Sequence, residues 1–362
     1  MDARRRPFPE DNPHPRGGSR MIVRSRSPVR ICDIGGWTDT RFAKRGAVLN
    51  LAVSLFGHCL VEDRPGNGNG HGDDRVAVLR ALDLGVDVSI EDVAKIEYGG
   101  ALDLLKAAVK RLDMSGGFRA SVWSDAPPGS GVGSSAAVGV SLVGALGHFA
   151  GRKMPPHDIA KTAQALETQE LGLECGVQDQ YASAFGGVCF MEIEYPRVEL
   201  SRLPVAPSFL WELEERLVLV YVGESRLSDA VHRLVIQRYE AAVPEAVAAM
   251  DTLRGAAHAM KDAMLGEDMA GVVEAINANW AAQKSLHPDI TNPSIEGLFE
   301  TARAHGAAAG KANGAGGGGT VTFVAEPGRE MKLRKALGEV PGCVVLPCLI
   351  CQEGVRSWVV RE

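Results

Sequence analysis

The sequence lacks the features that would place it in a membrane or on a nucleic acid. It contains no run of about 18 uninterrupted apolar residues, so no segment is long enough to span a bilayer as a helix. It also lacks a basic excess, because 39 Lys and Arg stand against 45 Asp and Glu, for a net charge of -6. A nucleic-acid-binding or acidic-membrane surface needs such an excess. We therefore expect no membrane and no nucleic-acid partner, and a small-molecule ligand instead.

The first 20 residues lack the apolar segment of a secretory signal. Because they are rich in Pro, Arg and Gly, we expect residues 1–20 to form a disordered basic tail, with Met21 as the translation start. Residues 65–74 (PGNGNGHGDD) are expected to form a flexible loop between strands. The seven cysteines, an odd number scattered among apolar segments, favour a reducing cytoplasm.

Secondary-structure patterns change along the chain. Apolar and β-branched runs dominate residues 21–62, whereas helical spacing dominates 228–284, with breaks near Pro244 and Gly266. No internal repeat is present, and the mixture predicts an α+β fold. Cys348 and Cys351 form a CxxC, but no second pair or His cluster completes a zinc site. We interpret this segment as strand packing.

The strongest motif is a glycine-rich loop, PPGSGVGSSAA, at residues 127–137. Alternating glycines let backbone N–H groups turn inward without Cβ obstruction, which forms a nest for phosphate oxygens. A helix expected to begin near Ser134 adds free N–H groups and a favourable dipole. The loop is not a Walker A sequence, because no Gly-Lys-Ser/Thr follows. The alternative, a plain turn with a Ser cap, needs fewer glycines and serines.

Two further loops are rich in glycine. Residues 313–320 (NGAGGGGT) contain four consecutive glycines, which cost about 0.5–1 kcal/mol each, so we expect close backbone approach to a ligand. A flexible linker is the alternative. Residues 27–40 (SPVRICDIGGWTDT) place Arg30 on a strand and Asp39 after a Gly-Gly turn. Taken alone this third signal is weak, because Asp39 is equally compatible with a turn cap.

Two carboxylates stand near the middle of the chain. Glu167 lies in an expected helix over 157–171, and Asp179 follows a break that contains Gly176. An acid on a helix can share Mg²⁺ with a Ser hydroxyl, and a second acid can accept the proton of an attacking hydroxyl. On periodicity alone, either is more often a solvated surface acid, and the neighbouring loops favour the functional interpretation.

The three glycine-rich elements, in this order, resemble the GHMP kinases (galactokinase, homoserine, mevalonate and phosphomevalonate kinases) from Met21 to the C-terminal strands. The resemblance implies a two-domain α+β fold. Its N-terminal domain, over 21–205, would be similar to ribosomal protein S5 domain 2, and its C-terminal domain, over 206–362, would be ferredoxin-like.

Several segments are similar to sugar kinases that phosphorylate the anomeric hydroxyl. SDAPPGSGVGSSAA, GVQDQYASAFGG, GAAAGKANGAGGGG and WAAQKSLHPDITN look like the D-glycero-D-manno-heptose 7-phosphate kinases. Those kinases usually carry Gly-Gly-Gly-Thr-Asp where this sequence has GGWTD at 35–39, which looks like the kinase domain of L-fucokinase. The identity of the sugar is therefore open.

The resemblance implies a role for each matching residue. Asp179 would be the catalytic base, or the acceptor that orients the sugar hydroxyl, and Arg30 beside it would offset charge on the transferring phosphoryl group. Mg²⁺ would be held by Ser135, with Ser134 as second choice, and by Glu167. ATP would bind Pro127, Gly129, Ser130, Gly131, Gly133, Ser134, Ser135 and Ala136. The sugar would bind Gly36, Trp37, Asp39, Gln178, Gly316 and Gly317, with Lys284 on a substrate phosphate if one is present.

We therefore expect a cytoplasmic MgATP-dependent kinase, a monomer or homodimer, acting on the C1 hydroxyl of a heptose 7-phosphate or related sugar. The alternatives are a fucokinase- or galactokinase-like enzyme of an unphosphorylated sugar, a kinase of a small alcohol or phosphorylated isoprenoid, and a non-catalytic sensor. Sensors of this fold lose an acid or a loop residue, whereas Arg30, Ser135, Glu167 and Asp179 are present. The basic cluster around Arg41 is a phosphate site or, more simply, a solvated turn.

Overall fold

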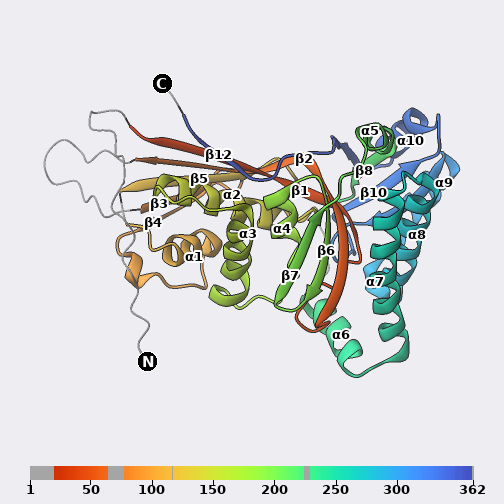
Figure 1. Ribbon diagram of the computed structural model, residues 1–362, viewed down its shortest axis with the longest axis horizontal. Helices are drawn as coiled ribbons and strands as arrows, with labels where there is room; N and C mark the ends of the chain where they lie inside the picture. The colour runs from red at the N-terminus through yellow and green to blue at the C-terminus, as the bar shows by residue number, and fades with distance from the viewer. Residues whose placement is uncertain (1–19, 64–76, 116, 224–228, 361–362) are drawn as a thin grey trace, which may run out of the picture.

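The computed structural model describes residues 20–63, 77–115, 117–223 and 229–360. The predicted tail up to residue 19 and the predicted loop at 65–74 lie outside these residues. Two sheets organise the chain (Figure 1), one of eight strands and one of four. The larger contains β1 (Ile22–Ile34), β2 (Arg45–Asp63), β3 (Ala77–Ala81), β4 (Val86–Ile90), β5 (Phe118–Ser124), β6 (Val188–Glu194), β7 (Arg197–Arg202) and β12 (Arg356–Val359).

The long strand β2 is the centre of the larger sheet. Its first half pairs with β6 and its second half with β5, and β1 runs antiparallel along its other side. From Val53 to Val61, buried and half-buried positions alternate, as expected for a strand with one covered face. In β1, by contrast, every residue from Ser27 to Ile34 is buried. The end of β1 therefore lies inside the molecule, next to the glycine-rich turn that follows it.

Helices cover one face of this sheet (Figure 1). They are α1 (Asp103–Arg111), α2 (Ser134–Phe149), α3 (Pro156–Ala165) and α4 (Gln178–Phe185). The apolar run after residue 135 is confirmed as a buried helix, and α2 begins at Ser134 as predicted. The predicted helix over 157–171 is confirmed as α3, which continues into a single π-helical turn, Leu166–Glu170. Such turns occur often at functional sites, and this one carries Glu167.

The four-stranded sheet has the order β11-β8-β10-β9 and is antiparallel throughout. Its strands are β8 (Leu217–Tyr221), β9 (Ala307–Ala312), β10 (Thr320–Ala325) and β11 (Val344–Leu346). The remaining helices are α5 (Pro207–Arg216), α6 (Asp229–Glu240), α7 (Pro244–Leu265), α8 (Met269–Leu286), α9 (Pro293–Ala304) and α10 (Glu330–Gly338). The predicted breaks near Pro244 and Gly266 are confirmed. Among the described residues, none of the helices is both long and apolar enough to cross a bilayer.

The chain finally returns to the sheet where it began. Residues 356–359 form β12, which pairs antiparallel with β1, and Ile350 bridges to Val53. The predicted division at residues 205 and 206 stays a prediction, and the last strand belongs to the N-terminal sheet. The CxxC lies between β11 and β12 rather than within a strand, because β11 ends at Leu346; Cys348 is buried there all the same.

Candidate active site

A pocket with a volume of about 220 Å³ opens where the end of β1, the start of α4 and the loop after β9 meet. Carboxylates dominate its wall, and Arg30 is the one Lys or Arg among the described residues that line it. The lining residues are Arg30, Asp33, Trp37, Asp39, Thr40, Glu167, Glu174, Cys175, Gly176, Gln178, Asp179, Gln180, His232, Gly314 and Ala315.

Arg30 and Asp179 form a paired contact in this pocket, as the resemblance implied. Arg30 Nε donates to Asp179 Oδ1 at 2.8 Å and Nη2 donates to Oδ2 at 3.2 Å, so both carboxylate oxygens are held. Burial acts to lower the pKa of Arg30, but the carboxylates of Asp179 and Asp33 outweigh it and the pKa is raised. Arg30 is 4% exposed and Asp179 is 27% exposed. The fixed pair therefore presents its carboxylate to the pocket.

The loop of residues 127–133 lies against β1 and ends at the first turn of α2. The backbone N–H of Arg30 donates to Val132 O at 3.0 Å, and Arg30 Nη1 donates to Gly131 O. Gly129, Gly131 and Gly133 all have positive φ, which side chains disfavour. A Cβ on Gly133 would lie 3.0 Å from Asp179 Oδ2. The bare backbone therefore brings the start of α2 next to Asp179. The free N–H groups at this helix start suit the phosphate oxygens of a bound ligand.

Glu167 and Ser135 meet beside this loop. Ser135 Oγ donates to Glu167 Oε1 at 3.3 Å, while Gln180 Nε2 donates to Oε2 at 2.7 Å. Burial raises the pKa of Glu167, so the ionised carboxylate lacks compensating charge in this arrangement. A carboxylate next to a hydroxyl is a donor set that fits a hard cation, since Mg²⁺ needs only one or two protein ligands. No cluster of three or more His, Cys, Asp or Glu suited to a metal occurs in the described ranges.

Asp39 also lines the pocket and is 1% exposed. Its carboxylate accepts hydrogen bonds from the backbone N–H of Gln178 at 3.1 Å and from Gln178 Nε2 at 3.4 Å. Burial raises its pKa to about 6, against the lowering effect of the Gln178 backbone. A Cβ on Gly176 would lie 2.0 Å from Asp39 Oδ2, so the break before α4 needs this glycine. Asp39 and Gln178, both predicted to bind the sugar, are thus brought together. A Cβ added to Gly36 would lie 3.3 Å from Gln178 Nε2.

Trp37 also lines the pocket. It adopts a positive φ of 75° in the Gly-Gly turn and is 6% exposed. Its ring lies 4.5 Å from that of His232, at an interplanar angle of 31°. His232 comes from α6, and neither periodicity nor a motif indicated it. The indole therefore forms an aromatic part of the wall between the turn and α6.

The glycine-rich loop at residues 313–320, the third along the chain, packs onto the other two. Asn313 Oδ1 accepts the backbone N–H of Cys32 at 3.1 Å, and Thr320 Oγ1 donates to Ser130 O at 2.9 Å. An added Cβ on Gly319 would lie 2.7 Å from that same Ser130 carbonyl. The predicted need for a bare backbone is therefore met by close approach between chain segments, and close approach to a ligand stays a prediction.

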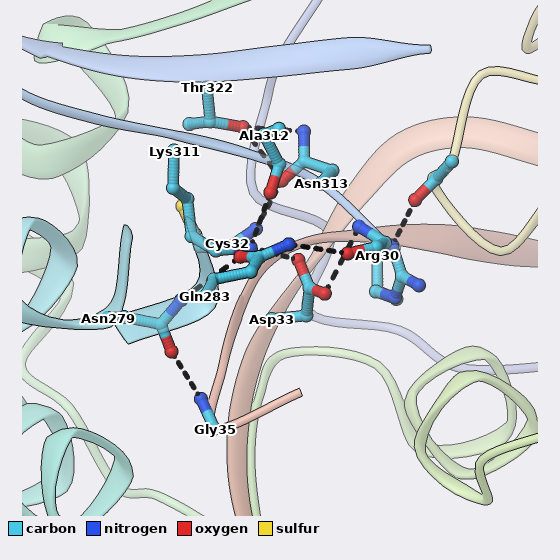
Figure 2. A network of polar contacts seen from close by, with 12 residues as sticks. Arg30, Cys32, Asp33, Gly35, Asn279, Gln283, Lys311, Ala312, Asn313 and Thr322 are labelled. Carbon is cyan, nitrogen blue, oxygen red and sulfur yellow. Dashed lines mark hydrogen bonds and ion pairs between the residues drawn. The ribbon is translucent and has the colours of Figure 1, made fainter. Parts of the chain in front are cut away.

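Four polar residues that the sequence did not single out hold the turn after β1 and the neighbouring Gly314. Figure 2 shows Asn279, Gln283, Lys311 and Asp33 around this turn. Asn279 Oδ1 accepts the backbone N–H of Gly35 at 2.7 Å. Gln283 Nε2 donates to Gly314 O at 2.9 Å, and Lys311 Nζ donates to Asp33 Oδ1 at 2.6 Å. The one available signal was a Lys within a run of Ala and Gly, GAAAGKANG.

Three predicted sugar-binding residues lie outside the pocket lining. Lys284 Nζ contacts Glu296 Oε1 at 3.3 Å and lies 5.6 Å from the centre of the Trp280 ring. Gly317 donates its N–H to Ile290 O at 2.8 Å, and an added Cβ on Gly316 would meet the same carbonyl at 2.6 Å. From the third loop, Gly314 and Ala315 reach the pocket instead. The roles given to Lys284, Gly316 and Gly317 stay predictions.

Comparisons with known proteins agree with this architecture. Residues 98–187 match the family model for the GHMP kinases N terminal domain, and residues 259–341 match the model for GHMP kinases C terminal. A D-glycero-alpha-D-manno-heptose 7-phosphate kinase of Campylobacter jejuni is 29% identical, over 93% of this chain and 98% of that protein. A bifunctional fucokinase/GDP-fucose pyrophosphorylase of Arabidopsis thaliana is 28% identical, over 86% of this chain but 31% of that protein.

Two solved structures are similar over most of their length. A D-glycero-D-manno-heptose 1-phosphate kinase from Bacteriodes thetaiotaomicron has a TM-score of 0.75 at 26% identity, covering 94% of this chain and 100% of that one. A putative sugar kinase from Campylobacter jejuni has a TM-score of 0.76 at 28% identity, covering 94% and 98%. The two matched domains, the interlocked glycine-rich loops and the two-sheet fold lead to one conclusion: this chain carries the N-terminal and C-terminal domains of the GHMP kinases.

Proposed function

We propose that this protein is a sugar kinase that transfers the γ-phosphoryl group of MgATP to a sugar hydroxyl, the C1 hydroxyl of a heptose 7-phosphate or related sugar. The observation that carries the proposal is the Arg30–Asp179 pair, held in the pocket wall beside the glycine-rich start of α2. The similarity to a heptose 7-phosphate kinase over 93% of the chain supports the choice of sugar.

The chain's residues contribute position and charge rather than a covalent intermediate. Asp179 accepts a hydrogen bond from the attacking hydroxyl and takes up its proton as the new phosphate bond forms. Arg30 keeps the carboxylate in one orientation through two hydrogen bonds, and its charge lies next to the transferring phosphoryl group. Asp39 accepts hydrogen bonds from other sugar hydroxyls, and Trp37 offers an aromatic face at the pocket wall.

The nucleotide is proposed to lie along residues 127–136, where the N–H groups of the loop and of the α2 start meet the phosphates. Ser135 and Glu167 are proposed to hold Mg²⁺. When bound, this ion would supply positive charge that offsets the charge developing on the phosphoryl group. The raised pKa of Glu167, caused by burial, supports a cation next to its carboxylate.

A second cavity supports a substrate that already carries a phosphate. Arg41 and Lys44 line a cavity of about 830 Å³, and Glu174 belongs to the walls of both cavities. Arg41 contacts Glu174 across this boundary. Among the described residues, the sugar pocket is lined by five carboxylates and one cation, whereas the second cavity is lined by two carboxylates and two cations. A phosphate is therefore accommodated better beyond Glu174 than inside the pocket.

The same acidic lining favours a second candidate, a kinase of an unphosphorylated sugar. A neutral polyol suits a wall of carboxylate acceptors, and Trp37 stands where the sequence resembles L-fucokinase. The two candidates differ in one measurable property, namely whether a distal phosphate raises kcat/KM. A cytoplasmic location, supported by seven free cysteines, and a monomeric or homodimeric state remain part of the proposal.

The test is ADP release against a panel of sugars with and without phosphate: heptose, heptose 7-phosphate, fucose, galactose and mannose. We expect the highest kcat/KM for heptose 7-phosphate, and ³¹P NMR of the product should show a phosphate on the anomeric carbon. A phosphate ester on another carbon would overturn the C1 assignment. Highest kcat/KM for a neutral sugar would select the second candidate.

A further inference from the structure

A buried ion pair joins the pocket wall to β9. Asp33 is at the end of β1 and Lys311 is in β9; their side chains are 2% and 0% exposed, with Oδ1 and Nζ 2.6 Å apart. Lys311 Nζ also donates to Ala312 O at 2.8 Å. A buried ion pair is often no more stabilising than apolar residues of similar volume. Stability alone is therefore a weak reason for these two charges to lie here.

The second oxygen of Asp33 leads to the third glycine-rich loop. Asp33 Oδ2 accepts the N–H of Gly314 at 3.1 Å, and the carbonyl of Gly314 accepts a hydrogen bond from Gln283 at 2.9 Å. Gly314 is thus held at its N–H and at its carbonyl, by side chains from two different elements. Asp33 and Gly314 both line the pocket. The ion pair therefore fixes part of the pocket wall.

Gly314 in turn contacts the loop that holds Arg30. A Cβ on Gly314 would lie 2.8 Å from Gly131 O, so the two backbones are in direct contact. Gly131 O accepts a hydrogen bond from Arg30 Nη1, and the other guanidinium nitrogens hold Asp179. Close-packed segments transmit small displacements rather than absorbing them. A shift of Gly314 is therefore expected to move Arg30 and, with it, the Asp179 carboxylate.

We propose that Asp33, held by Lys311, is a positioning residue for phosphoryl transfer: it fixes Gly314 against Gly131 and so keeps Arg30 and Asp179 aligned with the acceptor hydroxyl. The inference rests on the proposed kinase function. It concerns alignment for the reaction, so it predicts a loss in kcat that is separate from ATP binding and from folding stability.

The decisive variant replaces both charges at once. Leu is branched like Asp and Met is unbranched like Lys, so D33L/K311M approximates the original side-chain shapes. It also leaves no unpaired buried charge. We expect kcat with the sugar to fall about 10- to 100-fold, the effect of misplacing reacting groups by about 1 Å. The KM for ATP should stay at its wild-type value, and the thermal unfolding midpoint should fall modestly, because the Gly314 N–H and the Ala312 carbonyl each lose a hydrogen-bond partner.

The chain offers a closely matched control on α1. Asp103 Oδ1 lies 2.8 Å from Lys106 Nζ, and Asp103 Oδ2 accepts backbone N–H groups from Gly99 at 2.6 Å and Gly100 at 3.1 Å. This pair combines the same two functions, but it is outside the pocket lining. D103L/K106M should therefore keep wild-type kcat, whatever it does to stability.

The kinetics of these variants either support or overturn the positioning role of Asp33. D33L/K311M with kcat within about twofold of wild type would overturn the inference, as would a kcat loss that only follows the loss of folded protein. If this variant does not fold, Q283M removes the other tether of Gly314 and should lower kcat about 2- to 10-fold, the effect of one hydrogen bond. Unchanged kcat in Q283M then overturns the inference. Wild-type protein that phosphorylates no sugar of the panel identifies failure of the proposed function itself.

Discussion

Two parts of the pocket lining differ in the groups that surround a carboxylate. We call them the Arg30 wall, formed by Arg30 and Asp179, and the Asp39 wall, formed by Asp39 and Gln178. On one wall, Asp179 faces the guanidinium of Arg30 and keeps part of its surface open to the pocket. On the other, Asp39 is buried and is held by the amide groups of Gln178. An amide donor stabilises a carboxylate without a full opposite charge, so burial prevails at Asp39 and raises its pKa to about 6.

This difference in surroundings suits the two carboxylates to two different functions in one pocket. A carboxylate beside a fixed cation keeps its orientation through a reaction, which suits the group next to the attacking hydroxyl. A buried carboxylate with spare acceptor capacity gains most when hydroxyl donors arrive, which suits a group that binds the sugar. The comparison predicts that changes on the Arg30 wall act on kcat, whereas changes on the Asp39 wall act on KM and on pH dependence.

The largest expected effect is that of D179N, which keeps the shape of the side chain and removes its charge. Loss of the proton acceptor should lower kcat by about 10²- to 10⁴-fold, with a much smaller change in the KM for ATP. Steady-state kinetics with ATP and the preferred sugar measure this. Near-normal turnover would remove Asp179 from the proposed role.

A control for D179N is another Arg–Asp pair outside the pocket. Arg80 Nε donates to Asp87 Oδ2 at 2.8 Å on the β3–β4 hairpin, where both side chains are more than a third exposed. D87N should leave kcat and KM unchanged, because an exposed pair contributes little. A kcat loss shared by D87N and D179N would show that charge removal acts generally and not through the pocket.

The second effect concerns the pH dependence of the Asp39 wall. The folded-state pKa of Asp39, about 6, lies above its ordinary value of 3.8, so the native state binds the proton more tightly than the unfolded state. The resulting stability is complete below pH 3.8 and is lost as the pH rises through 6. Sugar binding needs the ionised form as acceptor. We expect kcat/KM for the sugar to fall below about pH 6, with kcat/KM for ATP affected less.

D39N tests the same wall without titration. Gln178 Oε1 is buried without a hydrogen-bond partner, so its amide group can flip and accept from the new amide. The variant should therefore fold, with stability at neutral pH equal to or above wild type. Its kcat/KM for the sugar should drop about 10- to 100-fold, the effect of a hydrogen bond to a charged group, and the fall below pH 6 should disappear. A persistent acid limb would assign that limb to another group.

The local backbone structure around the pocket could be predicted from the sequence. Positive φ at Gly131 and Gly133, and the helix start at Ser134, depend on residues next to one another, so motif and composition were sufficient. The contact between Arg30 and Asp179 spans 149 residues and was implied by the family resemblance rather than by any pattern. The predicted contact is confirmed, while the catalytic role stays a proposal.

The supporting residues were missed because their signals are ambiguous and their partners distant. Asp33 and Lys311 are 278 residues apart, and a single Lys in a strand of small residues reads the same whether it is buried or solvated. The same applies to β12, four residues that pair with β1 across almost the whole chain. Long-range pairing of this kind depends on the complete fold, which periodicity does not encode.

The smallest expected effect is that of K284M. This variant tests whether a phosphate on the substrate contacts a cation outside the pocket lining. Lys284 is engaged by Glu296, and Thr291 Oγ1 donates to the same carboxylate oxygen at 2.7 Å, so the ammonium has a local partner. The KM for heptose and for heptose 7-phosphate should therefore change by less than about twofold. R41M is the matched comparison, because Arg41 also has a carboxylate partner, Glu174, but unlike Lys284 it lines the cavity that shares Glu174 with the pocket. R41M should raise the KM for heptose 7-phosphate about tenfold and leave that for heptose unchanged. The reverse pattern, an effect in K284M and none in R41M, would place the distal phosphate at α8.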